Sequence, residues 1–132
     1  MIEKIDHVGI AVDSISDALE LYEALGMEVE GYEEVAAEGV RVAMIRCGES
    51  RIELLESIRD DSPIARFLAK RGGGVHHICL ATDDIRADQR SLEAAGIQVL
   101  RPAPSRGAGG CWVQFIHPRS AAGVLVELSE AG

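Results

Sequence analysis

The first apolar stretch of the chain, residues 5–12, alternates between two kinds of side chain. Bulky apolar residues occupy one set of positions, and His7, Gly9 and Ala11 occupy the other. Successive side chains of a strand point to opposite faces, so the pattern predicts a strand with one apolar face and one roomy face. The pattern returns 70 residues later, with a second roomy face formed by His77, Cys79 and Ala81.

The similarity between the two stretches continues along the rest of the chain and indicates two copies of one structural unit. The offset is 70 residues at first and grows to 74 near the end of each copy, as loop insertions would cause. A fixed order of matched positions is typical of a structural duplication. The matched pairs are His7 and His77, Asp13 and Asp83, Gly26 and Gly96, and Glu53 and Glu127.

Each copy predicts the element order β-α-β-β-β. After the first strand, Ser14 or Asp13 can cap a helix that Gly26 ends, and Asp83-Asp84 and Gly96 do the same in the second copy. Apolar residues recur at helical spacing between these signals. The predicted later strands are Met27–Tyr32, Val40–Arg46 and Arg51–Leu55, and then Ile97–Arg101, Trp112–His117 and Gly123–Ser129.

A linker with its own helix joins the two copies. Ser62 is a good N-cap, Pro63 suits the first helical position, and glycines 72–74 end the helix. We therefore predict a single α+β domain over residues 1–132. It consists of two tandem βαβββ modules, residues 1–57 and 74–132, with a linker helix at about 62–71, and forms a cupped mixed β-sheet with flanking helices.

Composition and charge narrow the classes of partner. The chain is 47% hydrophobic and carries a formal net charge of −9, which argues against a nucleic-acid surface. No apolar run approaches the roughly 20 residues of a membrane span, and the first residues enter a strand directly, so we expect no signal peptide. Three cysteines without CxxC spacing indicate reduced thiols and a cytoplasmic protein.

Two histidines and two glutamates recur at equivalent places in the copies. A buried carboxylate without a partner costs several kcal/mol, and a divalent cation would pair such groups most simply. Two imidazoles with two carboxylates suit Co²⁺, Zn²⁺, Ni²⁺, Mn²⁺ or Fe²⁺. Singly, a strand histidine is more often structural and a strand glutamate more often solvated. The recurrence favours a metal site formed by His7, Glu53, His77 and Glu127.

Other polar residues have less specific interpretations. His76 points to the face opposite His77 and is interpreted as structural or as a support for the neighbouring ligand. His117 ends a strand and is expected to face a loop rather than to contact a substrate. Trp112 is expected to pack rather than to stack on a ligand. A local basic patch for an anionic ligand could come from Arg101, Arg106 and Arg119.

These features resemble the vicinal-oxygen-chelate superfamily, in which paired βαβββ modules surround a metal. Within it, four stretches look like the methylmalonyl-CoA epimerase family. The first stretch is common to the superfamily, and the later ones are more specific. They are residues 6–12, 61–68, 74–79 and 117–128.

The resemblance implies an enzyme that interconverts the C2 epimers of methylmalonyl-CoA through a metal-stabilised enolate. It implies Co²⁺ as the most favoured metal, an acyl-CoA substrate and a homodimer. His7, His77 and Glu127 would be ligands, and Glu53 stands where some members have glutamine. Glu127 is the predicted catalytic base. Some members carry another carboxylate on the strand matching Val40–Arg46, which this chain lacks, so Glu53 is the candidate for the second base.

Three alternatives share this scaffold. A glyoxalase I-like enzyme acting on a thiol adduct would use the same four ligands. An Fe²⁺ dioxygenase would use three of them, although no clear pocket His and Tyr for oxygen chemistry are found. A metal-free small-molecule-binding protein would have no need for the four ligand positions.

Overall fold

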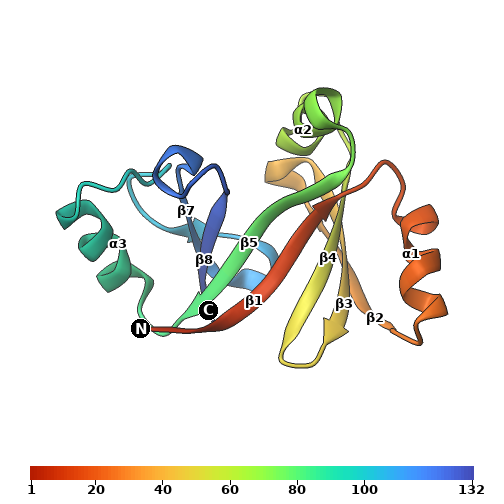
Figure 1. Cartoon of the computed structure of the whole chain (residues 1–132), viewed down its shortest axis with the longest axis horizontal. Helices are drawn as coiled ribbons and strands as arrows, with labels where there is room; N and C mark the ends of the chain where they lie inside the picture. Colours follow the sequence, from red (N-terminus) through yellow and green to blue (C-terminus); the bar gives the residue numbers. More distant parts are fainter. The chain divides into compact units, whose positions relative to one another are not determined.

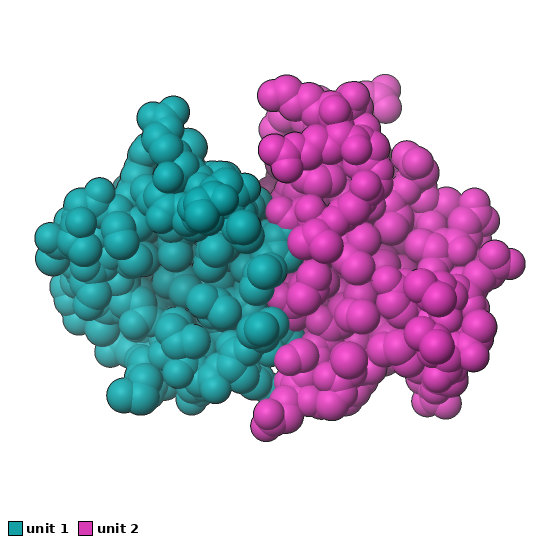
Figure 2. Space-filling model, in the orientation of Figure 1, with its two compact units in different colours: residues 1–6, 77–132 teal, residues 7–76 magenta.

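The structure is a computed structural model that describes all residues from Met1 to Gly132. The chain forms two compact units, coloured separately in Figure 2. Unit 1 contains residues 1–6 and 77–132, and unit 2 contains residues 7–76. Strands β1 (Ile2–Ala11) and β5 (Gly74–Thr82) each pass from one unit into the other, so the unit boundaries differ from those of the predicted modules.

Unit 2 holds the predicted β-α-β-β-β order. Strand β4 lies between β3 and β1, antiparallel to β3 and parallel to β1, and β2 forms the edge of this part of the sheet. Figure 1 labels the strands and the two α-helices of this unit. After β1 the elements are α1 (Ile15–Ala24), β2 (Val29–Val35), the short helix η1 (Ala36–Glu38), β3 (Val40–Cys47), β4 (Ser50–Ser57) and α2 (Pro63–Arg71).

The sheet of unit 2 buries apolar residues on both faces. On one face, Ile15 and Leu19 of α1 pack against Ile45 and Leu54 of the strands. On the other face, Ile64 of α2 belongs to a cluster that also contains Ala11, Val40, Val42 and Leu55. Successive residues of β3 and β4 therefore pack against different helices, because successive side chains of a strand point to opposite faces.

Unit 1 is built on the same plan with shorter strands. Its strand order is β1-β5-β8-β7-β6, with β5 and β8 parallel and the pairs β7/β8 and β6/β7 antiparallel. After β5 its elements are α3 (Ile85–Ala94), β6 (Ser105–Arg106), η2 (Ala108–Gly110), β7 (Trp112–Ile116), η3 (Pro118–Ser120) and β8 (Val126–Glu130).

The side chains expected to cap the three helices do so. The Ser14 hydroxyl accepts the Asp17 N–H at 3.2 Å, and the Ser62 hydroxyl accepts the Ala65 N–H at 3.0 Å. The Asp84 carboxylate accepts the Ala87 N–H at 3.1 Å in the third helix. Each bond satisfies a backbone donor that has no partner within its helix.

The predicted strand Ile97–Arg101 is wrong. This segment makes only an isolated bridge between Val99 and Ile116. The fully buried Gln114 amide explains the difference, because it donates to the Arg101 carbonyl at 2.9 Å and to the Gln89 side chain at 2.8 Å. Gln89 in turn donates to the carbonyl of Pro102, a residue without a backbone donor for a strand ladder. Gln98 and Leu100 each keep one backbone hydrogen bond to the β7 segment, and side-chain amides supply the partners only at Arg101 and Pro102.

In each unit, a glutamate at the end of the last strand accepts a hydrogen bond from the backbone N–H of the first residue of the helix that follows the first strand. We call this contact the helix-to-strand clamp. Glu56 of β4 accepts the Ile15 N–H at 2.7 Å, and Glu130 of β8 accepts the Ile85 N–H at 2.8 Å. The two glutamates lie 74 residues apart, which is the offset of Glu53 and Glu127. The duplication thus repeats a helix-to-strand clamp that the sequence analysis did not recognise.

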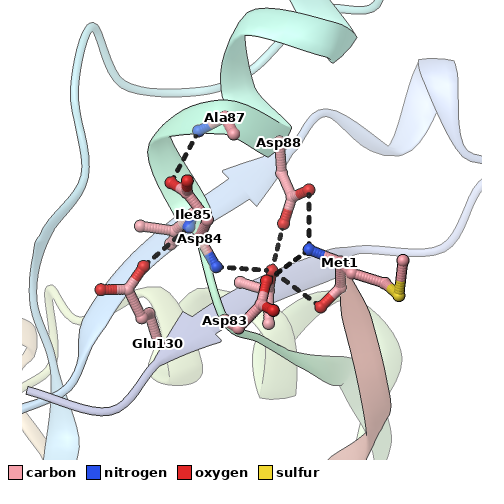
Figure 3. A network of polar contacts seen from close by, with 8 residues as sticks. Met1, Asp83, Asp84, Ile85, Ala87, Asp88 and Glu130 are labelled. Carbon is pink, nitrogen blue, oxygen red and sulfur yellow. Dashed lines mark hydrogen bonds and ion pairs between the residues drawn. The ribbon is translucent and has the colours of Figure 1, made fainter.

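Figure 3 shows the polar network around the clamp of unit 1. The Met1 ammonium lies 2.5 Å from the Asp83 carboxylate and 3.9 Å from that of Asp88. The hydrogen bond to Asp83 raises the pKa of the Met1 ammonium, and the same bond lowers the pKa of Asp83. Thr82 bonds both the Met1 carbonyl and Asp88, so these contacts link the start of β1 to the start of α3.

The predicted α+β fold class is confirmed. Eight strands belong to one mixed sheet, and three α-helices accompany them. The chain contains no helix with the length and apolar composition needed to cross a membrane.

Candidate active site

Unit 2 contains a buried His–Glu pair. His7 lies on β1 and Glu53 on the parallel strand β4, where the register sets Glu53 beside Gly9. His7 Nδ1 is 3.4 Å from Glu53 Oε2, and only 7% of His7 and 4% of Glu53 is exposed. The two side chains predicted from the repeat are therefore brought together within this unit.

Arg51 also contacts Glu53. Its Nη2 atom lies 3.4 Å from the same oxygen, Oε2, that approaches His7. Arg51 is the register partner of His7 and stands two residues before Glu53, so all three side chains leave the same face of the sheet. The sequence placed Arg51 in the predicted strand of Glu53 without a role of its own, and a basic residue two positions before a buried glutamate was the available signal.

Unit 1 contains the equivalent pair. His77 Nε2 on β5 lies 3.1 Å from Glu127 Oε1 on β8, and each residue is 7% exposed. The register sets Glu127 between Cys79 on one neighbouring strand and Phe115 on the other. The second predicted pair is thus also formed.

A small residue stands beside each of the two glutamates. Gly9 is the strand partner of Glu53, and Cys79 is the strand partner of Glu127. Both small residues come from the sequence positions that predicted the roomy faces.

An aromatic residue and an arginine surround the pair of unit 1. The Phe115 ring meets the His77 ring edge-on, with centroids 6.5 Å apart and an interplanar angle of 79°. The Arg101 guanidinium lies over Phe115 at 5.2 Å. A positive charge therefore stands near the His77–Glu127 pair in the same unit.

Two of the three arginines predicted to form one basic patch, Arg101 and Arg106, lie on different faces of β7. Arg106 stacks on Trp112 at 3.9 Å, with Arg86 at 5.4 Å from the same ring. Trp112 and Phe115 occupy positions of opposite parity on β7, so Arg106 and Arg101 serve opposite faces of the strand. Trp112 is therefore packed by arginines, as a residue with a packing role would be.

The two remaining histidines have structural contacts. The His76 ring packs edge-on against Phe67 of α2 at 5.0 Å. His117 Nδ1 accepts the Arg119 N–H at 3.0 Å and caps η3. The contact of His76 agrees with its structural interpretation, and His117 caps η3, the short helix that follows β7.

A groove of about 370 Å³ also lies in unit 2. It is lined by residues 10–14, 17, 18, 73 and 74, at the end of β1 and the start of α1. Neither His7 nor Glu53 lines this groove. The buried His–Glu pair, with its small neighbour, is therefore the better candidate for chemistry.

Chemically, each pair offers one imidazole nitrogen and one carboxylate inside the protein. Such donors bind divalent metals of borderline to hard character, and a carboxylate can also transfer a proton. The fold and the two His–Glu pairs together indicate the class of protein to which the chain belongs. A family model described as "Glyoxalase/Bleomycin resistance protein/Dioxygenase superfamily" matches residues 6–115.

Relatives define the class more narrowly. The chain is 40% identical to a mitochondrial methylmalonyl-CoA epimerase of Dictyostelium discoideum, over 98% of this chain and 79% of that protein. It is 41% identical to the ethylmalonyl-CoA/methylmalonyl-CoA epimerase of Cereibacter sphaeroides, over 98% and 99%. It therefore belongs to the methylmalonyl-CoA epimerase family of enzymes within that superfamily.

A solved structure agrees with this assignment. A variant of the Streptomyces coelicolor methylmalonyl-CoA epimerase in complex with 2-nitronate-propionyl-CoA superposes with a TM-score of 0.95. The two chains are 39% identical, and the match covers 100% of this chain and 96% of the other.

Proposed function

We propose that this protein interconverts the two C2 epimers of methylmalonyl-CoA in a metal-dependent reaction. The observation that carries the proposal is the buried His–Glu pair at the same place in both repeats of a chain from this family. A duplicated pair of this kind supplies both metal donors and a proton acceptor.

The donor set fits a divalent cation. His7, Glu53, His77 and Glu127 supply two imidazoles and two carboxylates, all at most 7% exposed. Carboxylates at such depth are costly unless a positive group pairs with them. We propose that the four residues bind one divalent ion, with Co²⁺ favoured and Zn²⁺, Ni²⁺ or Mn²⁺ as alternatives. Bound there, the ion would supply Lewis-acid polarisation of the thioester carbonyl.

Glu127 is the proposed group for proton transfer. Epimerisation breaks the C2–H bond, leaves the electron pair in an enolate, and returns a proton to the opposite face of C2. Glu127 would accept the proton on one face, and its Oε1 atom lies 3.1 Å from His77 Nε2. Glu53 was the candidate from the sequence for the second face, but its Oε2 atom already contacts both His7 and Arg51.

The other predictions about the cellular context remain open to test. We propose an acyl-CoA as the small-molecule partner, in keeping with the names of the relatives. A homodimer and a cytoplasmic location remain predictions, which sedimentation and cell fractionation would check.

Deuterium exchange at C2 tests the proposal directly. The protein is incubated with (2R)-methylmalonyl-CoA in D₂O, with Co²⁺ or with a chelator. We expect deuterium at C2 and formation of the 2S epimer with Co²⁺, and neither with the chelator. No deuterium uptake with Co²⁺ would contradict the epimerase.

The same preparation distinguishes the alternatives. Turnover of a glutathione hemithioacetal instead of methylmalonyl-CoA would favour the glyoxalase I-like enzyme. A protein that retains no metal and takes up none on titration would be a metal-free binding protein of the same fold.

A further inference from the structure

The Arg101 guanidinium of unit 1 lies on the same face of the sheet as the buried His77–Glu127 pair. It is 5.2 Å from the centroid of the Phe115 ring, and that ring meets the His77 ring edge-on at 6.5 Å. The register of β7 against β8 makes Phe115 the direct partner of Glu127. Directly paired residues share a face and have Cβ atoms about 5 Å apart. A cation therefore stands beside the proposed acid–base group.

The backbone of Arg101 is held from the opposite face of β7. The fully buried Gln114 side chain accepts the Arg101 N–H at 3.3 Å and donates to the Arg101 carbonyl at 2.9 Å. Gln114 also donates to Gln89 of α3 at 2.8 Å, so the holding residue is itself fixed. None of these bonds uses the guanidinium. Replacing the Arg101 side chain therefore leaves the backbone contacts in place.

The guanidinium has two contacts of its own in unit 1. Arg101 Nη1 donates to Ser105 Oγ, and the Phe115 ring lies beneath the guanidinium carbon. Arg101 is half-buried, whereas Arg106 and Arg119 are exposed. A charge in a partly buried place is screened less by water and salt than a surface charge. Of the three arginines, Arg101 is therefore the one prepared for a specific anionic group.

The substrate of the proposed reaction carries such a group at the reacting atom. The free carboxylate of methylmalonyl-CoA is bonded to C2, and removal of the C2 proton adds negative charge next to it. A fixed cation at this place stabilises both the bound carboxylate and the enolate. The planar guanidinium matches a carboxylate with parallel N–H···O bonds. The phosphates of CoA, in contrast, lie at the far end of the long pantetheine arm.

We propose that Arg101 binds the free carboxylate of the substrate and thereby selects 2-carboxyacyl-CoA over acyl-CoA without that group. This proposal rests on the proposed epimerase function. Arg101 forms no covalent bond and transfers no proton; it holds the carboxylate while Glu127 acts at C2.

The test is Arg101→Met in the full-length protein loaded with Co²⁺, with malonyl-CoA and acetyl-CoA as probes. The two probes differ only in the carboxylate, and calorimetric titration gives the Kd of each. We expect the preference of the wild-type protein for malonyl-CoA to fall by about tenfold or more, as loss of a charge-assisted hydrogen bond does. The Kd of acetyl-CoA should change by less than about twofold, and this together with full Co²⁺ content shows that the variant is folded.

Two further variants make the result specific. Arg106→Met removes the same charge from the opposite face of β7, where Arg106 stacks on Trp112, and should keep the wild-type preference. Arg101→Lys keeps the charge without the planar fork, and should lie between the wild-type protein and Arg101→Met.

An unchanged preference for malonyl-CoA in Arg101→Met would overturn the proposal. Equal weakening of both probes would also overturn it, because it would place Arg101 on the CoA moiety that the probes share. An equal loss in Arg106→Met would show an effect of net charge alone and count against a contact. A wild-type protein whose preference depends on Arg101, but which exchanges no C2 hydrogen of methylmalonyl-CoA, would support the carboxylate contact and contradict the epimerase function.

Discussion

Unit 2 and unit 1 form the same buried His–Glu pair with different neighbours. In unit 2, Glu53 contacts His7 and Arg51 through one oxygen. In unit 1, the position of Arg51 is taken by Leu125, 74 residues later, and Glu127 contacts His77. The duplication has kept the pair and changed the charge at the position two residues before the glutamate.

This difference indicates a division of roles between the two glutamates. A carboxylate beside a guanidinium keeps its charge and its orientation, which suits a metal ligand. Glu127 has a leucine at that register position and Phe115 as a strand neighbour, which suits a group that must gain and lose a proton. A symmetric scaffold can thus support a reaction in which the two halves do different work.

The largest expected effect comes from the histidines. His7→Ala and His77→Ala should each lose bound Co²⁺ and lower epimerase activity by about 10³-fold, because Lewis-acid stabilisation contributes several kcal/mol. Metal analysis and the coupled assay check this on the same samples. His117→Asn, which changes a helix-capping residue, is the control and should keep both. Full metal content in either alanine variant would remove that histidine from the site.

The two glutamate variants should differ in their effects on activity, whereas the two histidine variants should behave alike. Glu127→Gln is expected to reduce activity by about 10²- to 10⁴-fold, the range for loss of a general base. Glu53→Gln should keep activity within about tenfold, because an amide oxygen can still act as a metal ligand. Steady-state rates at saturating Co²⁺ measure both. Equal losses in the two variants would show that the halves do not divide the work.

Arg51 is expected to act through Glu53. Arg51→Met should weaken Co²⁺ binding by about 10- to 100-fold, as the loss of a residue that orients a ligand does. The same change in a Glu53→Gln background should have little effect, since no carboxylate is left to orient. Calorimetric titration of the four proteins gives this comparison. Leu125→Met is the matched variant in unit 1, and a comparable loss there would count against a role for charge.

Much of this arrangement could be predicted from the sequence because it repeats. His7 and His77, and Glu53 and Glu127, stand at matching places, and strand periodicity put each residue on the correct face. The helix starts were predictable for a local reason, since Ser14, Ser62 and Asp84 bond to groups within three residues. Local chemistry and internal repetition are both visible in one sequence.

The missed features depend on contacts between segments far apart in the chain. The segment predicted as the strand Ile97–Arg101 forms little of a strand, because the Gln114 and Gln89 side chains hydrogen-bond to the backbone at Arg101 and Pro102. No local sequence pattern predicts these contacts. The face on which each β2 side chain lies depends on the register of β2 against β3. The bulge between Val29 and Gly31 changes that register in a way that simple alternation does not reveal.

The smallest expected effects compare how strongly each unit depends on the contact between its last strand and its helix. Glu56→Ala and Glu130→Ala each remove the carboxylate that accepts the first helical N–H, at 2.7 and 2.8 Å. Each should lower the free energy of unfolding by about 1 kcal/mol, in the range of a lost helix cap. Chemical denaturation measures both changes, and Glu20→Ala on the exposed surface of α1 is the control.

The double variant gives the sharper result. The two clamps share no partner, so the losses should add to within about 0.5 kcal/mol. A larger loss in one unit would show that its helix depends more on the clamp, and we expect this in unit 1, where α3 buries only Ile85 and Gln89 while α1 buries Ile15 and Leu19. An effect of Glu56→Ala that clearly exceeds that of Glu130→Ala would contradict this order, because the better-packed helix should need its clamp less.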